Sequence, residues 1–301
     1  MVERSASASA IAGFAGSLAS SSLYPLEMIK VRLIASGVKS IHSINYRNSY
    51  HVLKSMVSSQ GILSLYKGAH ISFASSFAWT LYFYIYEKAK KIHPKWFKEE
   101  HSELYLFTVA AEAAILSRLI TNPLWVVKTR VMLQNNSKSW YGDTFEAIKK
   151  IYRLDGLKGF YFGLIPGLVL CSNGAFQLYL YEHLKEILNS QDSSTKTAIS
   201  GGISKLLTTL VLYPMQSTMI RLQQEQYPSY LNTKAQDLPK DIKEERFFKG
   251  FKNCILKTFK NEGYRGFYRG LSLQLARILP SNALFFVVYE KIYGLVLDRE
   301  K

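Results

Sequence analysis

The stretch Pro25–Arg32, which reads PLEMIKVR, occurs three times in the chain in recognisable form. It returns as PLWVVKTR at Pro123–Arg130 and, more loosely, as PMQSTMIR at Pro214–Arg221. Each copy closes an apolar stretch, and the successive prolines lie 98 and 91 residues apart. A period of this length over nearly the whole chain predicts three copies of one structural unit, at residues 1–98, 99–192 and 193–301.

A second pattern follows each copy of the first. It begins with a polar residue followed by glycine. An aromatic residue stands five residues after this glycine, and a second glycine stands two residues after the aromatic one. The three copies are Gln60–Gly68, Asp155–Gly163 and Glu262–Gly270. The second glycine opens another apolar stretch, which ends in Tyr-Glu each time. The pattern therefore predicts that each unit consists of a long helix, a polar connector with a short amphipathic helix (49–58, 144–153 and 248–260), and a second long helix. The polar insertion between Tyr227 and Arg246, which contains two prolines, is typical of a loop.

Six charge-poor windows cover most of the remaining sequence. They span residues 5–26, 69–86, 104–123, 163–181, 197–215 and 271–289. Each is close to the roughly 20 residues that a helix needs to cross a bilayer, so the sequence predicts six transmembrane helices. The charges inside them, including Arg118, Lys205 and Arg277, are expected to face the bundle interior or a wet cavity.

Composition narrows the functional classes. The net charge of +16 favours anionic partners, and alone would fit a nucleic-acid-binding protein. Six apolar windows with prolines at their ends do not fit that reading, so no nucleic-acid partner is expected. The sequence has no glycine-rich phosphate loop and no His/Cys spacing typical of a metal site, and His70 and His183 are isolated. Neither catalysis nor a metal site is therefore predicted.

The repeated motifs resemble those of the mitochondrial carrier family, P-x-[DE]-x-x-[KR]-x-[KR] followed by [DE]-G and aromatic-[KR]-G. The resemblance covers all three units. It implies an all-α membrane protein in which six tilted transmembrane helices form a pseudo-threefold barrel of three helix-pair repeats with short matrix-side helices. It also implies a monomer that transports a small anionic solute by alternating access. The expected surroundings are the lipids, cardiolipin among them, of the mitochondrial inner membrane, with the peroxisomal membrane as the less favoured location.

The resemblance further implies an ion-pair gate on the matrix side. The family pattern pairs an acidic position of one repeat with a basic position of the next. Here these pairs are Glu27 with Lys128, Trp125 with Met219, and Gln216 with Lys30. The first is the one ion pair expected in this gate, and the other two are an apolar contact and a hydrogen bond.

A cytosolic gate is implied by the motif [FY]-[DE]-x-x-[KR] at the ends of the second helices. The expected pairs are Glu87 with Lys185, Glu290 with Lys90, and Glu182 with Tyr293. Two ion pairs on this side against one on the other predict a resting state that is closed to the cytosol.

Helical geometry predicts which side chains share the gate-facing stripes, because positions seven and eleven apart lie on one face. Arg118 precedes Trp125 by seven residues, and Lys205 precedes Gln216 by eleven. These two cations are therefore expected to line a positive central cavity, unless each is paired with a charge on a neighbouring helix. Trp79 and Phe83 lie eleven and seven residues before Lys90, and are expected to form its aromatic walls. Glu112 does not lie on this stripe, and we expect it to make a contact between helices.

Finer motifs indicate the solute. The resemblance places Arg277, Ser75, Ser76 and Leu170 at positions where family members contact their substrates. The stretch Thr121–Arg130, with Trp125 in the acidic slot, is similar to carriers of FAD, folate, NAD and pyrimidine nucleotides. The dipeptide Ser204–Lys205, with Tyr213–Gln216, is most similar to the FAD and folate group. We therefore expect FAD or folate as the transported solute, with no cofactor for catalysis. NAD or a pyrimidine nucleotide is the alternative solute, and a non-transporting membrane receptor or scaffold is the alternative role.

Overall fold

Each unit begins with a helix that carries the repeated proline. The computed structural model describes residues 22–37, 46, 48–93, 102–134, 142–187, 194–224, 250–278 and 280–281. These first helices are α2 (Tyr24–Ala35), α6 (Ser102–Leu133) and α10 (Ser194–Gln223). Pro25 stands in the first turn of α2, where its missing N–H leaves no intrahelical bond unmade. Pro123 and Pro214 lie inside α6 and α10, which continue through them.

The connectors contain the three short helices that the sequence predicts. They are α3 (Ser49–Gln60), α7 (Gly142–Asp155) and α11 (Phe251–Phe267). One-turn helices η1 (Ile62–Tyr66) and η2 (Leu157–Tyr161) follow the first two. The second long helix is α4 (Ala69–Ile92) in the first unit. In the second unit it is divided at Ser172 into α8 (Leu164–Cys171) and α9 (Asn173–Ile187). No strand occurs in these described ranges, in agreement with the predicted all-α class.

The repeat is also visible in backbone conformation. The two glycines of each connector have positive φ in every unit: 77°, 63° and 63° at Gly61, Gly156 and Gly263, and 82°, 73° and 83° at Gly68, Gly163 and Gly270. The second set lies where the chain turns into the second long helix, in a left-handed conformation that glycine adopts without steric cost. The structure therefore explains why the sequence repeats glycine at these points.

The same glycines join the units in cyclic order. A Cβ at the second glycine would lie 3.2 Å from a side-chain atom on the first helix of the next unit: Val131 for Gly68, Met219 for Gly163, and Lys30 for Gly270. The residue before each repeated proline closes its own unit. Tyr24 donates to the Lys67 carbonyl at 2.7 Å and Tyr213 to the Arg269 carbonyl at 2.8 Å. The three units thus meet around one end of the molecule, which we call the proline end.

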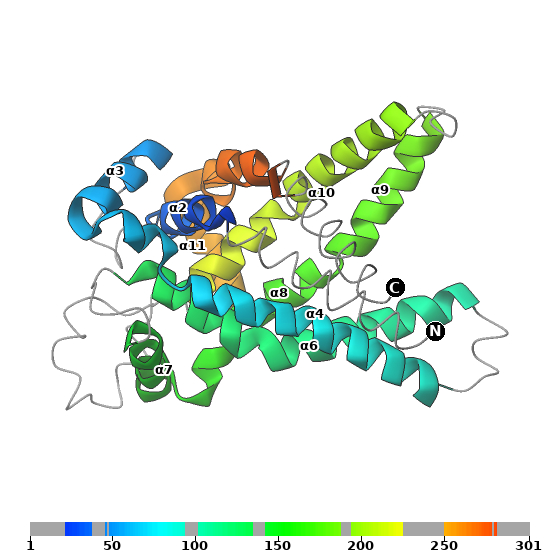
Figure 1. The fold of residues 1–301 in the computed structure, drawn as a ribbon, viewed down its shortest axis with the longest axis horizontal. Coiled ribbons are helices and arrows are strands. Elements are labelled where there is room, and N and C mark those ends of the chain that lie inside the picture. The colour runs from blue at the N-terminus through cyan, green and yellow to red at the C-terminus, as the bar shows by residue number, and fades with distance from the viewer. Residues whose placement is uncertain are drawn as a thin grey trace, which may run out of the picture.

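Figure 1 shows how the long helices leave this end. The antiparallel pairs α4–α6 and α9–α10 converge on the region that carries α2, α3, α7 and α11, and spread apart at the other end, which we call the hairpin end. The principal buried cluster lies at the proline end and includes Tyr24, Met28, Ile34, Met132 and Tyr213. Packing is therefore densest where the prolines and connectors meet.

By length and composition, one helical stretch of the described chain is able to cross a membrane, Leu157–Ile187. It contains the predicted window at 163–181. The helices α6 and α10 have sufficient length, but they carry charges such as Arg118, Lys128 and Arg221. Most of the first and sixth predicted windows lies outside the described residues. Hydropathy within the described chain thus supports one of the six predicted spans.

Candidate functional site

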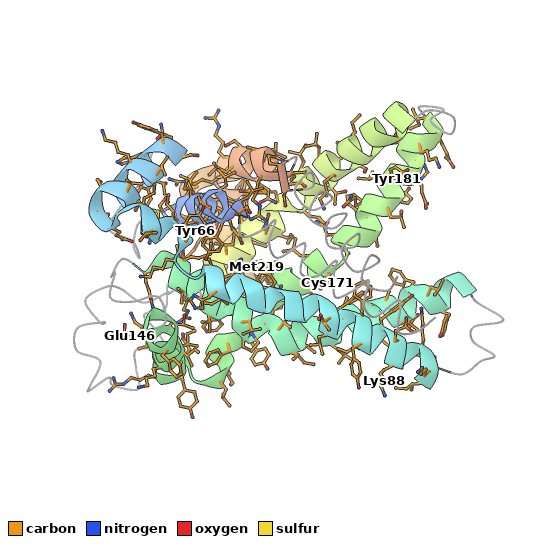
Figure 2. The ribbon with its side chains drawn as sticks, in the orientation of Figure 1. Tyr66, Lys88, Glu146, Cys171, Tyr181 and Met219 are labelled. Carbon is orange, nitrogen blue, oxygen red and sulfur yellow. The ribbon has the colours of Figure 1, made fainter. Side chains whose placement is uncertain are left out.

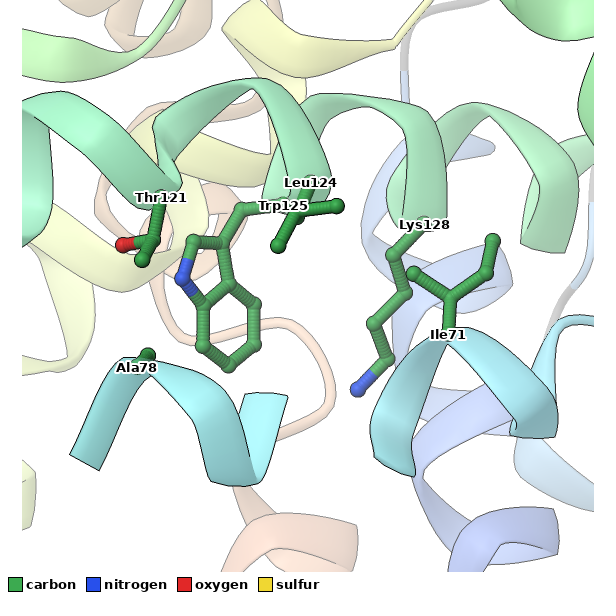
Figure 3. Close-up of a pocket in the computed structure, with 6 residues that line it drawn as sticks. All are labelled: Ile71, Ala78, Thr121, Leu124, Trp125 and Lys128. Carbon is green, nitrogen blue, oxygen red and sulfur yellow. The ribbon is translucent and has the colours of Figure 1, made fainter. Parts of the chain in front are cut away.

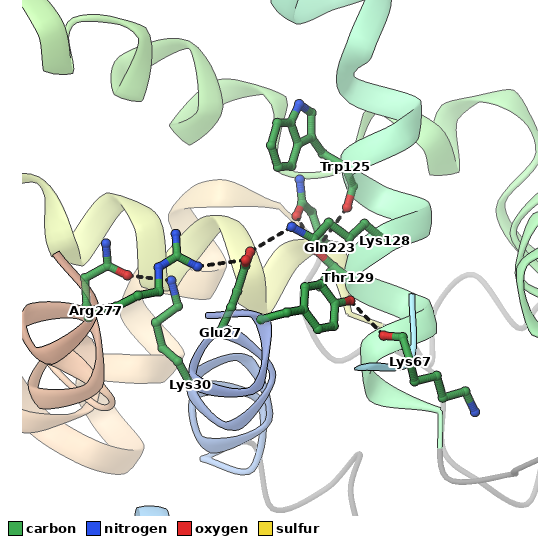
Figure 4. Close-up of polar contacts among 10 residues, drawn as sticks. Glu27, Lys30, Lys67, Trp125, Lys128, Thr129, Gln223 and Arg277 are labelled. Atoms are coloured by element: carbon green, nitrogen blue, oxygen red, sulfur yellow. Dashed lines mark hydrogen bonds and ion pairs between the residues drawn. The ribbon is translucent and has the colours of Figure 1, made fainter. Parts of the chain in front are cut away.

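A cluster of charges built around a single carboxylate lies at the proline end. Glu27 on α2 accepts a bond from Lys128 Nζ at 2.8 Å and another from Arg277 Nη1 at 2.7 Å, one on each oxygen (Figure 4). The Lys128 and Glu27 side chains are only 7% and 16% exposed. The ion pair expected between Glu27 and Lys128 is therefore present, and it is almost fully withdrawn from solvent.

One expectation for this cluster is wrong in this structure: Lys30 donates to Gln274 Oε1 at 2.8 Å, not to Gln216. Arg277 lies in the helical segment 271–278 and donates to Glu27, a contact that the sequence did not predict, while its role as a solute contact stays a prediction. Glu27 is the carboxylate within reach of several cations, and a buried charge is costly unless it is paired or hydrogen-bonded. The sequence pattern places Gln274 in no motif, so nothing in it identified this partner.

Trp125 stands on α6 between two cations. Lys128, which follows Trp125 in the sequence, has its Nζ 5.4 Å from the centre of the indole ring. Arg118, which precedes it, has its guanidinium carbon 5.8 Å from the same centre. The ring points from α6 toward α4, into a small pocket lined by Ile71, Ala78, Thr121, Leu124, Trp125 and Lys128 (Figure 3). Both cations are within the distance at which an aromatic face attracts them.

Arg118 contacts both members of the second gate pair, Trp125 and Met219. Its Nη2 donates to the Met219 sulfur at 3.0 Å, and its Nε is buried without a hydrogen-bond partner. It has no carboxylate partner among the described residues. The predicted pair of Trp125 and Met219 is therefore bridged by a guanidinium. Figure 2 shows Met219 and Cys171 in the middle of the molecule, near the point where the two helix pairs begin to separate.

Lys205 on α10, like Arg118, has no carboxylate partner among the described residues. Its ammonium donates to Gln177 Oε1 on α9 at 2.9 Å, and no ion pair to it is found in the described part of the chain. The alternative reading of Arg118 and Lys205, as partners of charges on neighbouring helices, is therefore not what this structure contains. Gln177 is a site residue that sequence analysis missed, because a single glutamine in an apolar helix carries no motif.

Several other predicted site residues lie on α4 and α8–α9. Phe83 is exposed, and Leu170 is partly buried at the end of α8. The side chains of Ser75, Ser76 and Trp79 are outside the described part, so their predicted contacts stay predictions. Glu112 accepts from His93 Nε2 at 2.9 Å and so joins α6 to the end of α4, which confirms the predicted contact between helices.

Of the three pairs expected at the hairpin end, only Glu87 with Lys185 lies wholly within the described residues, and it is not formed. Glu87 pairs with Lys90 of its own helix at 3.4 Å rather than with Lys185 on α9. Glu182 lies on α9 with Lys185, while Glu290 and Tyr293 are outside the described residues. The other two expected pairs, and the resting state predicted from them, therefore stay predictions. The lack of a bond between Glu87 and Lys185 agrees with the packing, because the pairs α4–α6 and α9–α10 diverge here (Figure 1).

The last arginine of each repeated motif holds the connectors. Arg130 pairs with Asp155 at 2.9 Å, and Arg221 forms two bonds to Glu262. Arg32, in the first unit, donates instead to the carbonyls of Met132 and Gln134 in the second unit. These links fix the short helices to the proline end. The sequence shows the repeat of these arginines but not their partners.

Comparison with known proteins identifies the class. The family model for mitochondrial carrier proteins matches three times, over residues 3–95, 99–192 and 190–300. The chain belongs to this family, whose members are transporters rather than enzymes.

Three relatives span nearly the whole chain. Folate transporter 1, chloroplastic, of Arabidopsis thaliana is 32% identical over 97% of this chain and 94% of its own length. The mitochondrial nicotinamide adenine dinucleotide transporter 1 of Saccharomyces cerevisiae is 31% identical over 92% of this chain and 74% of its own. The mitochondrial FAD carrier protein of the same yeast is 26% identical, with coverage of 92% and 93%.

Proposed function

We propose that the chain transports an anionic cofactor with a flat aromatic ring, FAD or folate, across the mitochondrial inner membrane by alternating access. The observation that carries the proposal is a pair of cations without a carboxylate partner in the described chain, Arg118 on α6 and Lys205 on α10. A cation withdrawn from water and left unpaired is destabilising, so a site of this kind favours an anionic ligand. Phosphate and carboxylate groups both bind guanidinium through charge-assisted hydrogen bonds.

The aromatic part of the solute has its own candidate partners. Trp125 presents an indole next to Arg118, and Phe83 is exposed on α4. Trp79 is the further predicted wall residue of the same helix. Aromatic side chains stack favourably on flat rings, and the ring adds to the binding that the anion provides. Relatives named for folate and for FAD transport support this choice of solute.

In this proposal the proline end is the matrix side and the hairpin end the cytosolic side. Six transmembrane helices, two from each unit, surround the pathway in a single chain. Glu27, Lys128, Arg277 and the bridge from Arg118 to Met219 close the matrix side, and the solute enters between α4–α6 and α9–α10 from the cytosol. In the opposite state of the cycle, Glu87 pairs with Lys185 and Glu290 with Lys90.

NAD is the second candidate solute, because several relatives are named as NAD transporters. It also joins flat rings to phosphates, so the same cations suit it. A direct competition separates the solutes: purified protein in liposomes is offered FAD, folate, NAD and a pyrimidine nucleotide side by side. We expect uptake of FAD or folate in preference to the other two.

The matched variants for this experiment are Arg118→Ala and Lys88→Ala. Both remove one positive charge, but Lys88 is exposed near the end of α4 (Figure 2), whereas Arg118 lies in the middle of α6. Uptake is expected to fall at least about tenfold in Arg118→Ala, as loss of one charge-assisted bond to an anion implies, and to stay within about twofold in Lys88→Ala. Uptake of NAD alone would replace the solute and keep the carrier role. No uptake of any solute by folded protein would favour a receptor or scaffold.

A further inference from the structure

The Arg118 guanidinium is held by three groups from three helices. The ring of Trp125, on α6, has its centre 5.8 Å from the guanidinium, and Gly167, on α8, lies directly against it. The sulfur of Met219, on α10, accepts a hydrogen bond from Nη2. The edge of the guanidinium formed by Nε and Nη2 is a fork that suits two oxygens of a carboxylate or phosphate. Here one position of that fork is filled by a thioether, a weak acceptor, and the other has no partner.

We infer that Met219 is a placeholder acceptor for Arg118 and that Gly167 is the residue that seats its guanidinium, so that an anionic group of the solute replaces the Met219 sulfur and releases α10 from α6. This inference rests on the proposed function, since it names the residues that couple the solute's anion to the gate. Oxygen anions form much stronger bonds to guanidinium than a thioether does, so the exchange favours the solute-bound arrangement.

The position of the bridge explains why the exchange matters for opening. In the repeat, Trp125 and Met219 occupy the places that Glu27 and Lys128 occupy one unit earlier. The ion pair of Glu27 and Lys128 joins α2 to α6, and the bond from Arg118 to Met219 joins α6 to α10. Arg118 lies seven residues before Trp125 on α6, about two helical turns toward the hairpin end. In the proposed transport path it is therefore the gate contact that a solute anion from the hairpin end meets first.

Gly167 makes this placement of Arg118 sterically feasible. A Cβ at residue 167 would lie 2.6, 2.7 and 2.9 Å from Nη2, Nε and Cζ of Arg118. Even alanine would therefore displace the guanidinium from the α8 backbone. The obstructed atoms are the far end of a flexible side chain, so the fold is expected to tolerate the change while Arg118 moves. A Cβ at Gly174, on α9, would meet no atom of the described residues within 4 Å, so this glycine provides a matched control.

The first test uses solute-free protein and does not depend on transport. Met219→Glu replaces the placeholder by a permanent carboxylate, and Met219→Gln is its neutral counterpart. Each is made with Arg118 present and with Arg118→Leu, and the thermal midpoint is measured in detergent. We expect Met219→Glu to raise the midpoint by roughly 3 °C over Met219→Gln only when Arg118 is present. An equal difference with and without Arg118 would overturn the placeholder assignment.

The second test compares Gly167→Ala with Gly174→Ala in the liposome assay, using FAD and folate as the probes. For Gly167→Ala we expect the half-saturating concentration to rise about tenfold, with a maximal rate within about twofold of the parent; a general defect in folding would lower the maximal rate instead. Gly174→Ala is expected to match the parent. An unchanged half-saturating concentration in Gly167→Ala would overturn the role of Gly167. If the parent protein moves neither probe, the proposed function fails, and the thermal cycle still decides the Arg118–Met219 coupling.

Discussion

Two neighbouring positions at the proline end solve the same problem in different ways. Between the first and second units, one carboxylate, Glu27, binds two cations, Lys128 and Arg277. Between the second and third units, one cation, Arg118, rests on an indole and a thioether with no acid near it in the described chain. The first position is a balanced internal charge cluster, whereas the second has a charge deficit that a solute can fill. The comparison teaches that closing a pathway and recognising an anion need opposite charge arrangements.

Removal of the carboxylate is the strongest way to break this comparison. Glu27→Gln leaves Lys128 and Arg277 facing each other without a counter-charge, and Lys30 lies one turn away on the same helix. We expect a loss of about 3–5 kcal/mol in the free energy of unfolding, the range found when one partner of a buried ion pair is deleted. Thermal unfolding in detergent measures it. Glu146→Gln, on an exposed position of α7, is the control and should change little. An equal effect in both variants would contradict the clustered charge as the cause.

Removal of one cation from the same cluster tests its balance. Lys128→Gln leaves Glu27 bonded to Arg277, so we expect a smaller loss than in Glu27→Gln, about 2 kcal/mol. The comparison of the two variants by thermal unfolding is the measurement. If Lys128→Gln were as damaging as Glu27→Gln, the bond from Arg277 would carry no stabilisation.

Replacement of Trp125 tests the contribution of the indole ring at the second position. Trp125→Leu keeps an apolar side chain but removes the aromatic face shared by Arg118 and Lys128. We expect destabilisation of about 1–2 kcal/mol, because each cation–aromatic contact contributes about 0.5–1 kcal/mol. We also expect weaker uptake of the aromatic solute. Trp125→Phe retains a ring, so its unfolding midpoint should lie between those of the parent and Trp125→Leu; a midpoint no higher than that of Trp125→Leu would exclude the ring as the cause.

The two cysteines, Cys171 and Cys254, differ in how accessible their thiols are to a reagent in solution. Cys171 is exposed beside Gly167, whereas Cys254 is a buried residue of α11, where burial raises the pKa of its thiol to about 12. The thiolate is the reactive form, so the folded protein should take up one equivalent of maleimide between pH 7 and pH 9. Cys254 should begin to react only as the pH approaches 12 or the protein unfolds. Mass spectrometry checks the stoichiometry, and Cys171→Ser should abolish the labelling; a label on Cys254 at pH 7 would contradict its burial.

The repeated motifs allowed most of the framework to be predicted. Glycine recurs where the backbone needs positive φ, and proline recurs on the first helix of every unit, so the three connectors could be located to within a few residues. Helical periodicity also placed Arg118 next to Trp125 correctly. The partners of Arg277 and Lys30 could not be predicted in the same way, because they depend on how segments far apart in the sequence pack against one another. Gln274 and Gln177 carry no sequence signal at all.

The sequence by itself determined that one motif recurs three times along the chain, that Arg118 shares a helical stripe with Trp125, and that the chain belongs with the mitochondrial carriers. These features depend on local backbone preference and on periodicity, which act over a few residues. Only the tertiary structure decided that Glu27 binds both Lys128 and Arg277, and that Arg118 donates to Met219 beside Gly167. The physical reason is that pairing of buried charges depends on distance in space and on desolvation, and both are set by how the three units pack together.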